Sequence, residues 1–83
     1  MNYFATFFTH SAAIKFSRFL TKNHIKNESS PVPRKLSSNC GIGVRFVYND
    51  NISDIYIDDM EKIYTVTNNN YVLYKNFDDE DNE

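Results

Sequence analysis

The hydrophobic and polar pattern at the start of the chain changes from the period of a strand to that of a helix. Residues 2–8 read NYFATFF, an apolar and aromatic run with large side chains on both faces, which is typical of a strand covered on both sides. From Ser11 to Lys22 the apolar residues recur at helical spacing, and basic and polar residues fill the other positions. Thr9 offers a hydroxyl that can cap this segment. The pattern predicts a strand over 2–8 and a helix over 11–22.

A proline-containing connection separates the next two predicted strands. Residues 25–29 could form a short strand. Pro31 and Pro33 follow, and because proline lacks an amide hydrogen, they exclude regular ladder pairing in the connection that runs to Ser38. Residues 41–48 then alternate large apolar side chains with other residues, which makes this segment the clearest strand in the chain.

The pattern between residues 51 and 60 is ambiguous. Its apolar residues fit helical spacing, whereas a shorter part of it could pass for a strand. We favour a short helix, because residues 49–51 (Asn-Asp-Asn) can cap one. Residues 61–67 predict a strand, and the asparagines at 68–70 predict a turn because asparagine tolerates positive φ. Residues 71–74 could add a short hairpin strand.

The order of these elements is β-α-β-β-α-β with a short extra C-terminal strand. This order predicts an α+β, ferredoxin-like fold, in which two helices cover one face of an antiparallel sheet. We expect a single domain over residues 1–77, which is near the lower size limit for independent folding. Residues 78–83 are strongly acidic, and we expect them to form a disordered tail.

Composition points to a reducing compartment. The chain has a single cysteine and therefore cannot form an internal disulfide, unlike the small secreted domains that depend on several. The first apolar run is too short for a signal-peptide core or a membrane span, and no basic residue precedes it. We expect a cytoplasmic protein that does not bind a membrane.

The charge balance argues against a nucleic-acid partner. The formal net charge is -2, but five of the eleven acidic residues lie in the last six positions. The rest of the chain carries nine Lys and Arg against six Asp and Glu, which suits a small anionic ligand. Nucleic-acid-binding proteins usually carry a denser basic patch.

The most informative segment for chemistry runs from Pro31 to Phe46 and contains the only cysteine, Cys40. A thiolate is the reactive form of cysteine, and cations, hydroxyls and amides stabilise it. The neighbouring groups that could do so come from Arg34, Lys35, Ser37, Ser38 and Asn39, and Gly41 leaves the thiol unshielded on one side. The alternative is that Cys40 is a small buried hydrophobic residue at the start of a strand, since free cysteine is among the most buried residue types.

Other motifs do not predict a cofactor or a metal site. His10 and His24 do not combine with Cys40 into any metal-ligand spacing. The Gly41-Ile42-Gly43 run lacks the third glycine and the following helix of a dinucleotide-binding motif. The same strand lacks the aromatic stacking residues of RNA-binding domains. Arg45 could hold an anion near Cys40, or it could simply extend from an exposed sheet face.

The segment as a whole resembles a small bacterial family, described as putative selenium/sulfur carrier protein-like. The resemblance rests on Pro31-Val32-Pro33-Arg34, on Ser37-Ser38, and on Cys40-Gly41 followed by an apolar strand with Arg45-Phe46. It covers roughly residues 2–67. The resemblance implies a carrier and not an enzyme, with a persulfide or a selenium adduct on Cys40.

The carrier hypothesis also assigns residue roles and partners. Arg34, Ser37 and Ser38 would stabilise the adduct, and the amide of Gly41 would assist. A cysteine desulfurase or another sulfur- or selenium-transfer protein would be the partner.

A competing interpretation is a non-catalytic interaction or regulatory module. Residues 2–8 carry aromatic side chains on both faces, which is more apolar surface than one layer of helices covers. In this interpretation the exposed sheet face would bind a partner or a second copy as a homodimer.

Overall fold

The computed structural model describes residues 1–36 and 38–77. In these residues five strands and one α-helix form, together with a short 3₁₀-helix. In chain order they are β1 (Asn2–Phe7), α1 (His10–Lys22), β2 (Asn27–Pro31), β3 (Ile42–Val47), η1 (Ile52–Ile55), β4 (Met60–Thr67) and β5 (Asn70–Asn76). The acidic segment 78–83 lies outside the described residues, so its predicted disorder stays a prediction.

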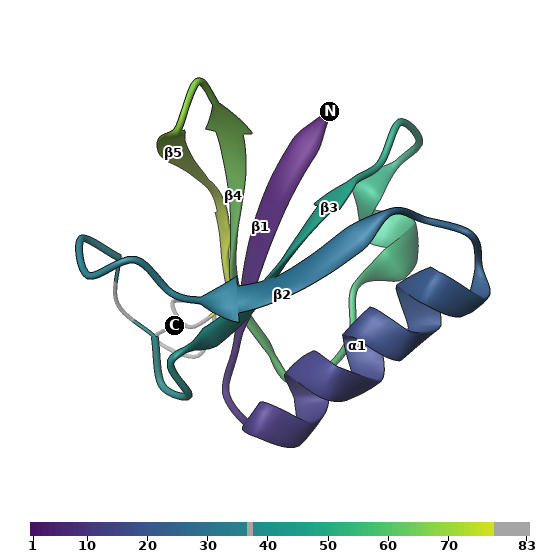
Figure 1. Cartoon of the computed structure of the whole chain (residues 1–83), viewed down its shortest axis with the longest axis horizontal. Coiled ribbons are helices and arrows are strands. Elements are labelled where there is room, and N and C mark those ends of the chain that lie inside the picture. The colour runs from purple at the N-terminus through teal and green to yellow at the C-terminus, as the bar shows by residue number, and fades with distance from the viewer. Residues whose placement is uncertain (37, 78–83) are drawn as a thin grey trace.

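The strands form one antiparallel sheet in the order β2-β3-β1-β4-β5. The strands fan out strongly in Figure 1, which shows the twist of the sheet, and α1 lies along one of its faces. β1 is the central strand. Five of its six residues are buried, which confirms the prediction that both of its faces are covered.

The main core lies between α1 and the sheet. Alternation along β1 turns Tyr3, Ala5 and Phe7 toward the helix, because successive strand side chains point to opposite faces. Phe16 of α1 is fully buried, and its ring centroid lies 5.4 Å from those of Phe7 and Phe46. The other buried residues of α1 are Ala12, Ala13 and Leu20.

The opposite face of the sheet is covered in part by the connection between β2 and β3. Phe4, Tyr64 and Val66 form a second buried cluster on this face. Val32 and Leu36 from the connection pack against it. Phe4 is therefore fully buried, and the aromatic side chain that would have formed an exposed sheet face lies beneath this connection.

The predicted ferredoxin-like fold with two helices is wrong, because the second helix does not form. η1 has four residues, and Tyr56 has an extended backbone (ψ 143°) that ends it. The buried residues Ile52 and Ile55 are three positions apart, which matches the three-residue turn of a 3₁₀-helix. Asn51 caps this single turn, since its side chain accepts a hydrogen bond from the Ser53 amide at 3.2 Å.

The predicted first helix is present. Thr9 is its N-cap, and the Thr9 hydroxyl accepts a hydrogen bond from the Ala12 amide at 3.2 Å. No helix in residues 1–36 and 38–77 is long and apolar enough to span a membrane.

Candidate functional site

Cys40 lies at the end of the connection that leads into β3. Its side chain is partly buried and packs against the core on the α1 side of the sheet. The Cys40 Sγ donates a hydrogen bond to the Ile42 carbonyl oxygen at 3.3 Å. The thiol therefore lies at the margin of the core, neither enclosed by it nor fully exposed.

Gly41 shapes the turn that follows the thiol. Its φ of 76° is in the left-handed region, which glycine adopts without a steric penalty. The Gly41 amide donates to the Ser38 hydroxyl oxygen at 3.3 Å, and the Gly41 carbonyl accepts from the Val32 amide at 3.0 Å. These bonds close the connection upon itself just before β3 begins.

A buried carboxylate holds the turn from the other side. Glu61 of β4 is only 3% exposed. Its Oε1 accepts a hydrogen bond from the Asn39 backbone amide at 3.2 Å, and its Oε2 accepts one from Asn39 Nδ2 at 2.9 Å. Lys62 Nζ lies 3.3 Å from the same Oε2 and forms an ion pair with it. The residue before Cys40 is thus attached to the sheet.

Glu61 was missed by the sequence analysis. It lies 22 positions from Asn39, so no local pattern connects the two residues. The one available signal was an acidic residue in a predicted strand whose other positions are mainly apolar or β-branched, since an acid in such a strand is rarely buried without partners.

The predicted site residues are brought together only in part. Ser38 and Gly41 belong to the closed turn around Cys40. Arg34 is exposed, and in the described part of the chain no hydrogen bond or ion pair joins it to the thiol. Ser37 lies outside the described residues.

Arg45 is engaged on the face opposite α1. Its Nη2 donates a hydrogen bond to the Tyr71 hydroxyl at 2.9 Å, and its guanidinium carbon lies 5.9 Å from the centroid of the Tyr71 ring. Lys35 Nζ lies 5.3 Å from that centroid. Tyr71 thus holds two cations at this face, and Arg45 contributes to packing there.

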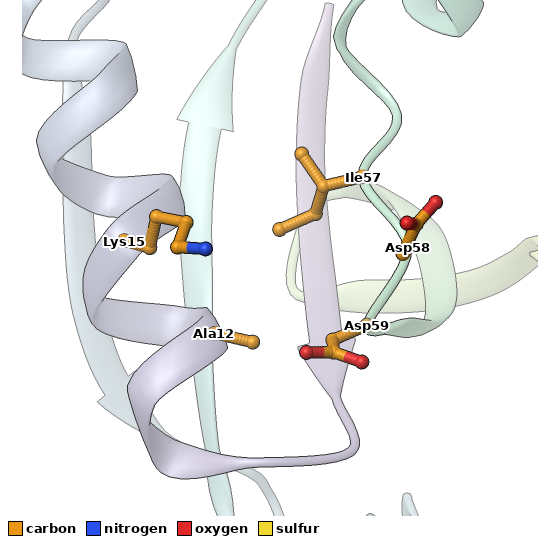
Figure 2. Close-up of a pocket in the computed structure, with 5 residues that line it drawn as sticks. All are labelled: Ala12, Lys15, Ile57, Asp58 and Asp59. Atoms are coloured by element: carbon orange, nitrogen blue, oxygen red, sulfur yellow. The ribbon is translucent and has the colours of Figure 1, made fainter.

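A separate hollow of about 470 Å³ lies between α1 and the segment before β4. Figure 2 shows Lys15 of α1 and Asp59 reaching into it from opposite sides, with Ala12 and Ile57 completing its walls beside Asp58. Cys40 does not line this hollow. Its lining comes from α1 and from residues 57–59, so the thiol is not part of it.

In the described residues no hydrogen bond joins either histidine to the thiol. His10 opens α1, and His24 follows its end with a φ of 61°. Both side chains are exposed. Among residues 1–36 and 38–77, no three His, Cys, Asp or Glu side chains gather closely enough to hold a metal ion.

Comparison with known proteins places the chain in a family. Neither the curated proteins nor the solved structures contain a significant match to it. The sequence profile of one family does match, over residues 2–77, which is nearly the whole chain and includes both Cys40 and Glu61. The protein therefore belongs to the family described as putative Se/S carrier protein-like.

Proposed function

We propose that this protein carries sulfur, or selenium, as a covalent adduct on Cys40. The observation that carries the proposal is the match to a family described as carrier-like, in a chain with one cysteine. Any adduct held on a thiol must then be held by Cys40. Its position at the margin of the core supports this role, because a carrier thiol has to be reached by its donor and still be shielded between transfers.

The transfer itself is a thiol exchange. The Cys40 thiolate attacks the outer sulfur of a persulfide on a donor protein, and a new sulfur–sulfur bond forms as the donor's own bond breaks. The donor leaves as a thiolate and takes up the proton that Cys40 has lost. No net oxidation occurs, so the step needs no further reagent. A donor carrying selenium in place of the outer sulfur would react in the same way.

A carrier role fits this site better than an enzymatic one. A cysteine nucleophile in an enzyme is normally activated by a base within hydrogen-bonding reach. Both histidines are exposed, and the hydrogen bond of the thiol goes to a backbone carbonyl. We propose that a cysteine desulfurase, or another sulfur- or selenium-transfer protein, loads Cys40, and that Arg34 and Ser38 assist the exchange. A thiol that must stay reduced suits the cytoplasm.

Persulfide loading tests the proposal. The protein is incubated with a cysteine desulfurase and free cysteine, and its mass is measured before and after treatment with a reductant. We expect a reversible gain of one sulfur atom on Cys40. Cys40→Ser is the control and should gain nothing. Absence of loading on Cys40, or equal loading of Cys40→Ser, would contradict the carrier function.

A second candidate function is an interaction module without thiol chemistry. The observation in its favour is the cluster of exposed apolar residues on β5, where Val72 is 61%, Leu73 50% and Tyr74 51% exposed. Apolar clusters of this kind commonly mark contact surfaces. The two functions are compatible, because a carrier also needs a surface for its partners.

A further inference from the structure

Glu61 is an acid in a place where acids are rare. A carboxylate that loses its water on folding is costly unless both oxygens find donors. Glu61 is 3% exposed, yet three donors reach its oxygens, two from Asn39 and one from Lys62. Each oxygen of the buried carboxylate therefore has at least one donor. Two of the three contacts hold Asn39, the residue adjacent to Cys40.

The strand that carries Glu61 is irregular at this residue. Phe7 of β1 pairs with Met60, whereas Thr6 pairs with Lys62, so Glu61 is an extra residue with no partner on β1. Such a bulge redirects a side chain away from the regular alternation, and bulges are frequent beside functional sites. The bulge explains how a residue of β4 can bond the connection before β3.

The turn is then fixed on both sides of the thiol. Before Cys40, the Asn39 amide and side chain are held by Glu61. After Cys40, Gly41 is held by Ser38 and Val32. With its backbone fixed at both neighbours, Cys40 directs its Sγ to the Ile42 carbonyl, where the side chain is partly buried. If the Asn39 contacts were lost, the thiol would move more freely toward solvent.

We propose that Glu61 is the positioning residue for sulfur transfer at Cys40. By holding Asn39, it keeps the thiol partly shielded from small reagents and oriented for a docked donor. This inference rests on the proposed carrier function, but the shielding that it describes can be measured without any donor. Glu61 acts through Asn39 and does not itself touch the sulfur.

The test combines two readouts that should move in opposite directions. Glu61→Gln removes the negative charge, so that at best neutral hydrogen bonds to Asn39 replace the charge-assisted ones. We expect the rate of Cys40 alkylation by iodoacetamide in the native protein to rise by about tenfold, as expected for the loss of one charge-assisted hydrogen bond. Loading by a cysteine desulfurase should fall by a similar factor.

A compensating variant separates positioning from simple destabilisation. Asn39→Asp alone places two carboxylates together and should also speed alkylation. In the double variant Glu61→Gln with Asn39→Asp, the new amide can donate to the new carboxylate while the backbone bond is kept. We expect both readouts to return toward their original values. Glu28→Gln is the matched control, because Glu28 is an exposed acid on β2, and neither readout should change.

Asn39→Ala covers the case in which Glu61→Gln does not fold, since Asn39 is exposed and its side chain can be removed without opening the core. Faster alkylation in this variant supports the inference. Unchanged alkylation in both Asn39→Ala and folded Glu61→Gln would overturn it. If the unmodified protein takes up no sulfur but the variants still alkylate faster, the positioning stands and the carrier function alone fails.

Discussion

At the scale of single residues, the two glycines are required for different reasons. A Cβ on Gly43 would lie 2.5 Å from Phe4 Cζ and 2.7 Å from the Ala5 carbonyl oxygen, and the backbone oxygen cannot move aside. We expect Gly43→Ala to lower the free energy of unfolding by about 3 kcal/mol, the upper part of the range for overpacking. A Cβ on Gly41 would meet open space. Gly41→Ala should therefore lower the free energy of unfolding only by the strain of a left-handed φ, about 1–2 kcal/mol.

Urea unfolding of the two variants checks this prediction. Gly41→Ala serves as the control, because the substitution is the same and only the surroundings differ. An equal or smaller loss of stability in Gly43→Ala would contradict the close approach of β1 to Gly43.

Two buried tyrosines, Tyr3 and Tyr64, make the stability of the fold pH-dependent in the alkaline range. Burial, and to a smaller extent Tyr74, raises the pKa of Tyr3, and burial raises the pKa of Tyr64. A raised pKa in the folded state means that the neutral tyrosine is favoured there over the tyrosinate. The stability gained by burying the neutral side chain is therefore fully present below about pH 10, and it is lost as the pH rises through the folded-state pKa. We expect the decline of unfolding free energy above about pH 10 to be shallower in Tyr3→Phe. An identical decline in the variant would contradict this.

The sequence pointed to Cys40, which carries the thiol, but not to Glu61, which holds the turn beside it. Cys40 and Gly41 could be singled out because a lone cysteine beside a glycine is visible in one short segment. Glu61 could not, since its role depends on a bulge that brings β4 against Asn39. Arg34 was expected, from its closeness in sequence, to stabilise an adduct on Cys40; it lies exposed, and its role stays a prediction.

At the scale of elements, α1 depends on its first turn for a defined start. Thr9→Ala removes the hydroxyl that accepts from the Ala12 amide, and we expect it to cost about 1 kcal/mol of stability. Thr9→Ser keeps the oxygen and should stay within about 0.5 kcal/mol of the original. Thermal or urea unfolding of the two variants makes the comparison. A Thr9→Ala variant as stable as Thr9→Ser would show that the cap contributes nothing.

The length of the segment explains why the α-helix at α1 was predicted correctly and the helix at residues 51–60 was not. The 13 residues of α1 make about three and a half turns, so the helical period of apolar residues repeats several times and can be recognised. The segment around η1 is short, and Ile52 and Ile55 fit a 3₁₀ turn as well as an α-helix. The asparagine turn was predicted correctly, since Asn68 and Asn69 have φ values of 52° and 68° between β4 and β5.

At the scale of the whole molecule, the central position of β1 agrees with its pattern of apolar residues on both faces. What the pattern could not reveal was the cover on the second face. Two helices were expected, both on one face, and the other face is closed in part by Val32 and Leu36. Such a connection carries no periodic signal, because Pro33 and the polar residues in it are ordinary for a loop.

The two edges of the sheet predict how the molecule associates. β2 is protected as an edge strand, because it is short, contains Glu28 and ends at Pro31. β5, at the other edge, exposes Val72, Leu73 and Tyr74. Residues 71–74 of this edge carry no charge, although Lys75 follows them, and an apolar stretch of this kind favours pairing with another strand. We expect the protein to self-associate through β5, with an average mass in sedimentation experiments that rises with concentration.

A single substitution on this edge distinguishes strand pairing from non-specific hydrophobic association. Leu73→Lys places a charge on the edge strand and should return the protein to a monomer over the same concentration range. Ile14→Lys is the matched control, because Ile14 on α1 is 48% exposed, nearly the same as the 50% of Leu73, but lies away from the sheet edge. Ile14→Lys should associate like the original. If both variants lose association equally, the contact does not run through β5, and a protein that stays monomeric without any substitution would contradict the edge contact altogether.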